Sequence, residues 1–356
     1  MRPQRFRGAL LIGIAALLLA AAAVSAQDRL ERFRAVTRDL ATAADAAERE
    51  RAVQAVYELI DAEVLDSLRG GEPFASPVFI RERLDALMEA WGGATLRVLR
   101  IPEAGRRGPI TVGLYSLAAV EVSGSLRLYT GIGSGASLAA VSTQDGLLDA
   151  QVWPPGPDRV ARVLALWSGP PAAHGMRALH AELWEGREGD RVGRTWTLGP
   201  AAGDGMRVTE WRAQPGELVI RYQPSYPGWK PGCVDQMEEE DHYRPSAAGG
   251  LAVSRRQISN AWRRELGVTA DALFRAIAIE DTRAIAQLVP APGLRARLPA
   301  TLVAEPVCEQ IGPSGPRGPV TVAATEVREG RRVPWALSWT RNAAGWRLSA
   351  ARPVLQ

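Results

Sequence analysis

The chain has 356 residues, of which 46% are hydrophobic and 23% charged, so its composition is that of a globular protein and excludes a collagen-like or a disordered class. Its formal net charge is +4, and Arg2, Arg5 and Arg7 in the leader account for three of those charges. The remainder is nearly neutral, which removes any electrostatic case for binding nucleic acid.

Met1–Ala26 has the layout of a secretory signal peptide. Its arginines precede an apolar run over 9–24, and Val24-Ser25-Ala26 forms a small-residue cleavage site. We therefore predict cleavage after Ala26 and a periplasmic or secreted protein that makes no further membrane contact. The alternative is an uncleaved anchor, although the run of about 15 apolar residues is short against the roughly 20 that a bilayer span needs.

Residues 27–93 are predicted to be helical. Asp28–Arg69 contains neither Gly nor Pro and repeats its apolar residues at helical spacing, as one long rod or as a hairpin bent near Ala44–Glu48. A further helix begins at Ser76-Pro77, where Ser is an N-cap and Pro suits the first turn. These helices either pack on the chain's own sheet or associate with a second copy through residues 28–69.

Residues 94–262 are predicted to form a Trp-rich antiparallel β domain, because the apolar period changes to two after Thr95. We favour a sandwich or an open sheet, with a propeller-like fragment as the alternative. The expected strands are Leu96–Ile101, Ile110–Leu117, Ser125–Tyr129, Leu138–Ser142, Leu147–Trp153, Val160–Trp167, Arg177–Trp184, Val192–Leu198, Val208–Trp211 and Leu218–Gln223. Together with the helices before and after them, they predict an α+β fold.

Residues 263–356 are predicted to form a small α+β unit. Thr269 is placed to cap a helix over 270–279, Asp281 opens another to residue 288, and three strands follow over 320–326, 333–341 and 346–352. The tryptophans of these strands are expected in the core. The element order of 267–356 resembles NTF2-like domains, a resemblance that implies a cone-shaped pocket for a ligand or for protein contacts and assigns no site residues.

The chain has two cysteines, Cys233 and Cys308. In an exported protein such a pair is expected to form one disulfide. It would join the β domain to the C-terminal unit.

The most distinctive candidate site is the segment 226–243. It combines Tyr226, Trp229 and Lys230 in a Pro- and Gly-rich turn with an acidic run that contains Glu238, Glu240, Asp241 and His242. An aromatic ring and a cation beside carboxylates suit a sugar, a peptide or a divalent ion. Asp235 and Glu239 add oxygen donors, but the spacing is not that of an EF-hand, so we assign no metal.

Motifs for catalysis or for a cofactor are missing from the sequence. Gly131–Gly135 lacks the helix of a dinucleotide fingerprint and is expected to be a hairpin loop, and His180 and Glu182 share a strand face as a structural pair. We therefore assign no catalytic residue and no cofactor, and we predict a non-enzymatic binding or accessory protein whose ligand or protein partner is unknown.

Three alternatives remain open for the function. The first is a hydrolase or metal-dependent enzyme that uses Glu238, Glu240 and Asp241 with His242 as its acid and base groups. The second is a carbohydrate binder, because 11 tryptophans are unusual and a flat ring stacks on a sugar face. The third is a helix-mediated scaffold built on residues 28–69.

Overall fold

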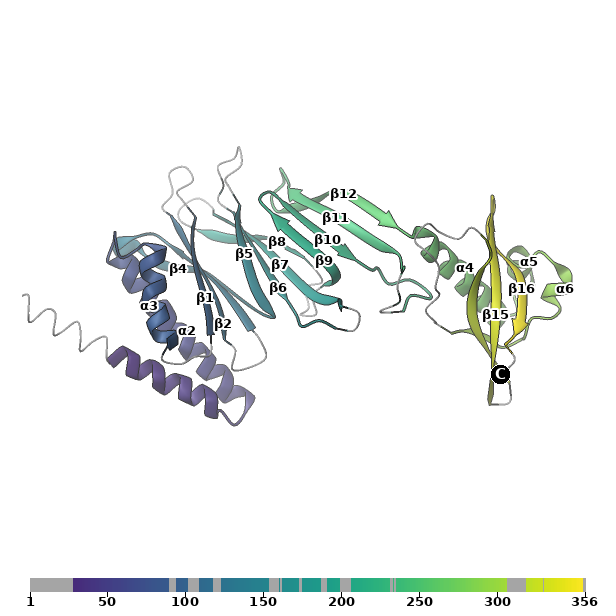
Figure 1. The fold of residues 1–356 in the computed structure, drawn as a ribbon. Coiled ribbons are helices and arrows are strands. Elements are labelled where there is room, and N and C mark those ends of the chain that lie inside the picture. The colour runs from purple at the N-terminus through teal and green to yellow at the C-terminus, as the bar shows by residue number, and fades with distance from the viewer. Residues whose placement is uncertain are drawn as a thin grey trace, which may run out of the picture. The chain divides into compact units, whose positions relative to one another are not determined.

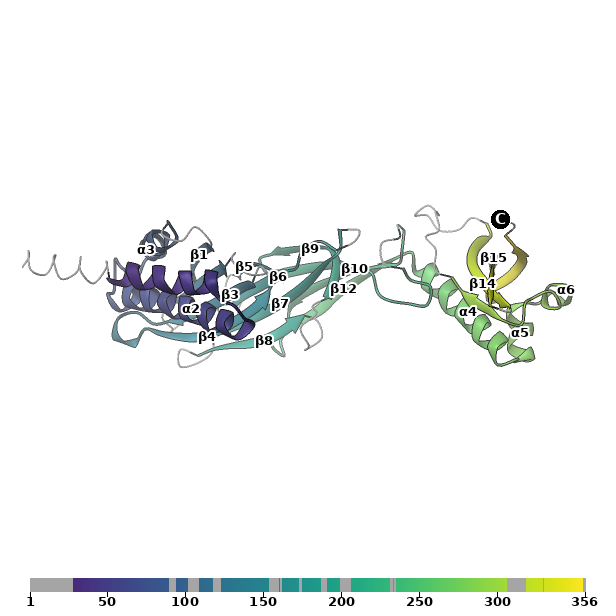
Figure 2. The same cartoon turned by 90° about the horizontal axis from the view of Figure 1, so that it is seen from below.

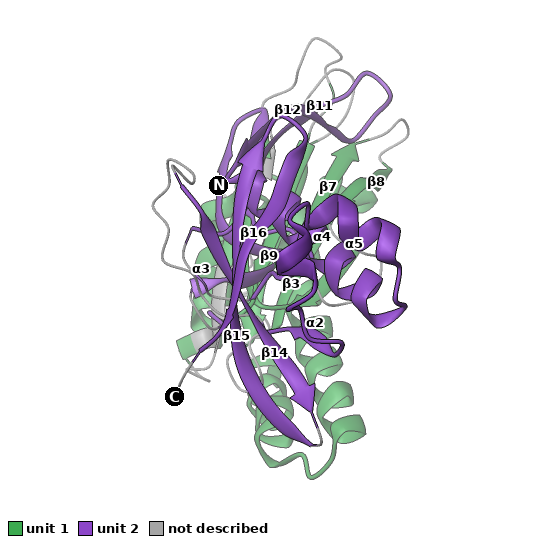
Figure 3. Cartoon of the chain, turned by 90° about the vertical axis from the view of Figure 1, so that its right-hand side faces the viewer, with its two compact units in different colours: residues 1–169, 179–199 green, residues 170–178, 200–356 purple. Residues whose placement is uncertain are grey.

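A computed structural model describes residues 28–89, 94–101, 109–117, 123–153, 160, 162–172, 175–186, 191–198, 206–230, 233, 235–305, 318–328 and 330–354. The chain divides into two compact units, coloured separately in Figure 3. Unit 1 comprises residues 1–169 and 179–199, and unit 2 comprises residues 170–178 and 200–356. The signal peptide and Cys308 lie outside the described residues, so export and the disulfide stay predictions.

The helical lead of unit 1 is a hairpin. A helix over 28–42 is followed by α2 (Ala46–Arg69), and α3 (Pro77–Glu89) comes next. The bend falls where Asp45 accepts a hydrogen bond from the Glu48 backbone N–H at 2.8 Å while the Glu48 carboxylate accepts one from the Ala44 N–H at 3.0 Å. These two hydrogen bonds, one to the N-cap Asp45 and one from the residue before it, begin α2 in a variant of the capping box. Ser76 caps α3 as predicted, through the Phe79 N–H at 3.2 Å.

Two antiparallel layers of strands follow in unit 1. The first is the sheet β1 (Ala94–Ile101), β2 (Ile110–Leu117), β3 (Ser123–Thr130) and β4 (Ser137–Asp145), with the short 3-10 turn η1 (Gly133–Gly135) in the predicted hairpin loop. The second layer pairs β5 (Leu147–Trp153), β6 (Arg162–Ser168), β7 (Arg177–Gly186) and β8 (Val192–Leu198) in that order. The predicted strands are therefore formed.

The two layers pack face to face as a sandwich. Val112, Leu114 and Leu128 of the first sheet share a buried cluster with Val163 and Trp167 of the second. The Trp167 indole N–H donates to the Gly124 carbonyl at 2.7 Å and ties the layers together. Because side chains alternate along a strand, the same sheet has a second face for the helices.

The helices cover that second face. Tyr115 and Tyr129 of the first sheet are buried in one cluster with Phe33, Val56 and Ile60 of the helical hairpin. Figures 1 and 2 show α2 lying along this sheet. The apolar stripe of the hairpin therefore packs on the chain's own sheet, which was one of the two expectations for these helices. Self-association through residues 28–69 stays a prediction.

Unit 2 begins with the antiparallel strands β9 (Met206–Gln214), β10 (Glu217–Tyr222), β11 (Glu238–Pro245) and β12 (Leu251–Ser259), each paired with the next. Strands β11 and β12 correct the sequence analysis, whose last expected strand in this region ended at Gln223. The acidic run on β11 lacks alternating apolar residues, and ion pairs to neighbouring strands take their place.

A helix longer than predicted follows β12. Helix α4 (Ala261–Ala278) begins after Asn260 and passes through Gly267, so Thr269 is not its cap. The Thr269 hydroxyl instead donates to the Glu265 carbonyl at 2.7 Å inside the helix. Helix α5 (Thr282–Leu288) begins at the predicted cap Asp281, whose carboxylate accepts from the Ala284 N–H at 3.0 Å.

The C-terminal sheet completes unit 2. After α6 (Pro292–Arg295), the strands β13 (Leu302–Ala304), β14 (Val320–Arg328), β15 (Arg331–Asn342) and β16 (Gly345–Pro353) form an antiparallel sheet in sequence order. Trp339 and Trp346 are buried in the cluster that packs this sheet on α4, as the sequence predicted. The mixed α+β class is confirmed. Within the described residues, no helix is both long and apolar enough to cross a membrane.

Candidate functional site

The predicted acidic site lies on strand β11, and the strand divides its residues between two faces. Successive side chains of a strand point to opposite faces of the sheet. Glu238, Glu240 and His242 therefore share one face, while Glu239 and Asp241 lie on the other.

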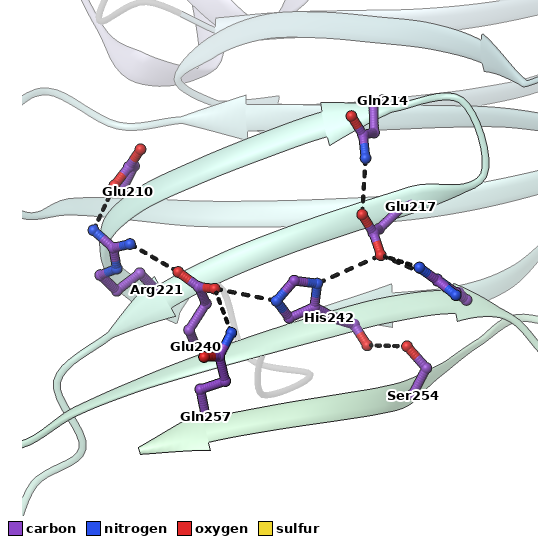
Figure 4. Close-up of polar contacts among 9 residues, drawn as sticks. Glu210, Gln214, Glu217, Arg221, Glu240, His242, Ser254 and Gln257 are labelled. Atoms are coloured by element: carbon purple, nitrogen blue, oxygen red, sulfur yellow. Dashed lines mark hydrogen bonds and ion pairs between the residues drawn. The ribbon is translucent and has the colours of Figure 1, made fainter. Parts of the chain in front are cut away.

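On the first face, His242 lies between two carboxylates, as Figure 4 shows. Its Nε2 is 3.1 Å from Glu240 and its Nδ1 is 3.4 Å from Glu217 on β10. Arg221 donates to Glu240 at 2.8 Å, and Arg244 donates to Glu217 at 2.8 Å. The result is a ladder of polar side chains across β10 and β11, in which Arg221, Glu240, His242, Glu217 and Arg244 are joined in sequence.

The arginines of this ladder keep both carboxylates ionised. The hydrogen bond from Arg221 is the main cause that lowers the pKa of Glu240, and the hydrogen bond from Arg244 is the main cause that lowers the pKa of Glu217. A general acid needs the opposite shift, toward a raised pKa. These two carboxylates are therefore matched to ion pairing.

On the opposite face, Asp241 is almost fully buried, with 1% exposure. It is held by the fork of Arg256, whose Nε and Nη2 donate at 2.6 and 2.7 Å. The Tyr222 hydroxyl donates both to Asp241 at 3.2 Å and to Glu239 at 2.6 Å. Burial, followed by the nearby Asp241 carboxylate, raises the pKa of Tyr243 to about 12.

The structure thus brings Glu240 and His242 together but places Asp241 on the other side of the sheet. A hydrolytic site would need these groups to converge on one substrate. The candidate residues of the hydrolase alternative are present, but the fold does not bring them together around one substrate position. Among the described residues, no group of three or more His, Cys, Asp or Glu side chains is arranged to hold a metal ion.

The turn before β11 separates the other predicted residues from the ladder. The Trp229 indole is half-buried and donates to Gln223 at 3.4 Å, while Lys230 is exposed. The Tyr226 hydroxyl donates to the Gln236 amide oxygen. Cys233 is buried with 3% exposure, and no described cysteine is free.

Tyr226 reaches a pocket whose lining residues were not assigned from the sequence. The pocket has a volume of about 130 Å³ and lies in unit 2, where α4, β13, β14 and the turn at 226–228 meet. Leu266 and Phe274 of α4 and Val322 of β14 give it apolar walls. The signal that could have found it is the spacing of Trp262, Leu266, Ala270 and Phe274, which is four residues and marks one helix face.

Polar groups surround these apolar walls. Tyr226, Gln236, Arg263, Asp271 and Glu305 all line the pocket. The Arg263 guanidinium lies over the Trp262 ring, 4.7 Å from its centroid. A concave apolar surface with a few polar groups is the usual form of a small-molecule site.

The turn is fixed against α4 by a close contact. A Cβ atom at Gly267 would lie 1.9 Å from the Pro227 carbonyl oxygen, so only glycine allows this approach. Asn260, which precedes α4, donates to the carbonyls of Asp235 and Gln236 at 3.1 and 3.2 Å. The segment that forms this wall of the pocket is therefore fixed at two points, at Pro227 against α4 and at Asp235–Gln236 by Asn260.

The predicted His180–Glu182 pair is structural. Glu182 has 0% exposure and lies 3.1 Å from His180 Nε2, and it accepts from Trp184 Nε1 at 2.9 Å and from Arg194 at 2.5 Å. Although burial acts to raise the pKa of Glu182, the hydrogen bonds from His180, Ser142 and Arg194 outweigh it and lower that pKa.

Glu182→Gln should lower the free energy of unfolding by about 1 kcal/mol at neutral pH. Because the pKa of Glu182 is lower in the folded protein than its ordinary value of 4.5, the ionised carboxylate stabilises the fold at pH values above 4.5. This contribution is lost as the pH falls from 4.5 through the lowered pKa. Urea unfolding at several pH values should therefore show the variant and the wild type converging in acid. Asp149→Asn, at an exposed ion pair with Arg97, is the control and should differ little from wild type at any pH. A gap that persists at low pH would refute the assignment.

Comparisons with protein-family models, with curated proteins and with solved structures found no match. The resemblance to NTF2-like domains therefore still rests on element order, and no residue of the pocket is carried over from a known protein.

Proposed function

We propose that this chain is an exported binding protein whose pocket in unit 2 takes a small, mostly apolar molecule. The observation that carries the proposal is the pocket itself, with apolar walls from Leu266, Phe274 and Val322 and polar groups around them. Export rests on the predicted signal peptide. The pairing of Glu240 and Asp241 with arginines favours binding over acid–base catalysis.

The size of the pocket sets the size of the first probe. A cavity of about 150 Å³ accepts a single benzene ring, and this one measures about 130 Å³. Benzyl alcohol therefore suits it, because it combines one ring with one hydroxyl group for the polar wall.

Benzyl alcohol should bind to the wild-type protein and should fail to bind to Ala304→Leu. Ala304 lines the pocket from β13 and is itself exposed, so a larger side chain there covers the pocket at little risk to the core. Saturation-transfer NMR detects such weak binding. Ala350→Leu, on an exposed position of β16 outside the pocket, is the matched control and should bind as wild type does. Equal signals from all three proteins, or none from wild type, would overturn the proposal.

A further inference from the structure

We infer that the pocket in unit 2 selects a small organic cation, an amine or a quaternary ammonium group on a compact apolar body. This inference rests on the proposed function and names the class of its ligand. It is carried by the charge of Glu305 and by the aromatic rings that line the same pocket.

Glu305 gives the pocket a carboxylate that no described cation neutralises. It follows β13 and is half-buried, and its Oε2 accepts a hydrogen bond from the Thr325 hydroxyl, a neutral donor. Thr325 is 1% exposed, so the carboxylate is anchored from the protein interior. A partly buried carboxylate favours a cation at its free lone pairs, because its desolvation is otherwise uncompensated.

The other charged groups of the pocket are already engaged. Asp271 accepts from Arg275 at 2.8 Å, one turn further along α4. Arg263 is 7% exposed and packs on the Trp262 ring. Of the two carboxylates that line the pocket, Glu305 is thus the one without an arginine partner among the described residues, and it disfavours an anion at its own end of the pocket.

Aromatic rings add a second preference for a cation. Tyr226 and Phe274 line the pocket from the turn and from α4, whereas the Trp262 ring already contacts the Arg263 guanidinium. The faces of such rings carry partial negative charge and attract ammonium groups, by about 0.5–1 kcal/mol at accessible sites. A carboxylate and aromatic rings in one pocket of single-ring size fit an arylalkylamine or a similar cation.

The test compares three probes with one ring each: benzylamine, benzyl alcohol and benzoate, titrated at neutral pH, where the amine is protonated. We expect benzylamine to bind about three- to tenfold tighter than benzyl alcohol, and benzoate to bind most weakly. Glu305→Gln keeps an oxygen for Thr325 and should bring benzylamine down to the affinity of benzyl alcohol. Glu265→Gln, on α4 and ion-paired with Arg341, should change nothing.

The salt dependence of binding, measured on the wild-type protein alone, gives a second test of the same inference. Added salt should weaken the binding of benzylamine and leave the binding of benzyl alcohol unchanged, because salt screens the attraction of Glu305 only for the charged ligand. If no probe binds, the proposed function fails. If benzyl alcohol and benzylamine bind equally, or benzoate binds best, the proposed function stands and the inference of a cationic ligand is overturned.

Discussion

Asp61→Ala should destabilise unit 1 by about 3–5 kcal/mol, the largest effect that we expect of a single substitution. Asp61 lies on the buried face of α2 and pairs with Arg127 of β3, which is 3% exposed. The Tyr129 hydroxyl donates to the same carboxylate at 2.6 Å. Without Asp61, the Arg127 charge would stay in the interface between helix and sheet with no anion beside it.

The Arg127 guanidinium is also held from a second side. It lies 4.4 Å from the centroid of the Tyr57 ring, one turn before Asp61 on α2. The ion pair, the tyrosine hydrogen bond and this ring contact all join the helical hairpin to the sheet. The loss should therefore appear as earlier unfolding in urea, followed by circular dichroism.

Asp66→Ala is the matched control, because it removes an aspartate of the same helix whose side chain is 49% exposed. Exposed ion pairs contribute about 0–1 kcal/mol. The double substitution Asp61→Leu with Arg127→Met should recover much of the loss, since it removes both buried charges at once. If Asp61→Ala costs no more than Asp66→Ala, the buried pair does not hold the helix to the sheet.

Elements with a regular apolar period could be predicted from the sequence. The helical character of 28–69, with a hairpin near Ala44–Glu48 as one of its two expected forms, the strand Ile110–Leu117 and the meander around Trp339 were all expected in place. In each case buried apolar residues recur at the period of the element. The sequence pattern therefore reports the same hydrophobic burial that stabilises the element.

Strand β11 could not be predicted in this way. Its residues Glu238–Tyr243 are all polar or aromatic, and partners on other strands stabilise them: Arg221 pairs with Glu240, and Arg256 with Asp241. Those partners are distant in sequence, so no local period reports them. The lining residues of the pocket could not be assigned for a related reason, because Tyr226, Trp262 and Glu305 come from three separate segments.

The start of α4 was predicted too late because Thr269 was taken as the cap of the helix. Gly267 lies in the interior of α4, where glycine normally costs about 1 kcal/mol relative to alanine. The structure gives its reason, since the Pro227 carbonyl oxygen occupies the space of a Cβ atom. Glycine at position 267 is therefore explained by the contact between α4 and the turn that forms a wall of the pocket.

Gly267→Ala should consequently destabilise unit 2, by about 3 kcal/mol, although alanine is the better helix former. The added Cβ would lie 1.9 Å from a backbone oxygen, which cannot rotate away as a flexible side chain would. Overpacking of this kind costs about 1–3 kcal/mol, and the clash with backbone places it at the upper end. Displacing the turn also moves Tyr226, so binding of benzyl alcohol should weaken in the same variant.

Gly293→Ala provides the control, because Gly293 lies in α6 and a Cβ there would meet nothing within 4 Å. It should keep or slightly raise the free energy of unfolding, as helix propensity alone predicts. Urea unfolding and the NMR binding signal, measured on both variants, separate the two effects. If Gly267→Ala were as stable as Gly293→Ala and still bound benzyl alcohol, the turn would not be packed on α4. The wall of the pocket would then have to come from another segment.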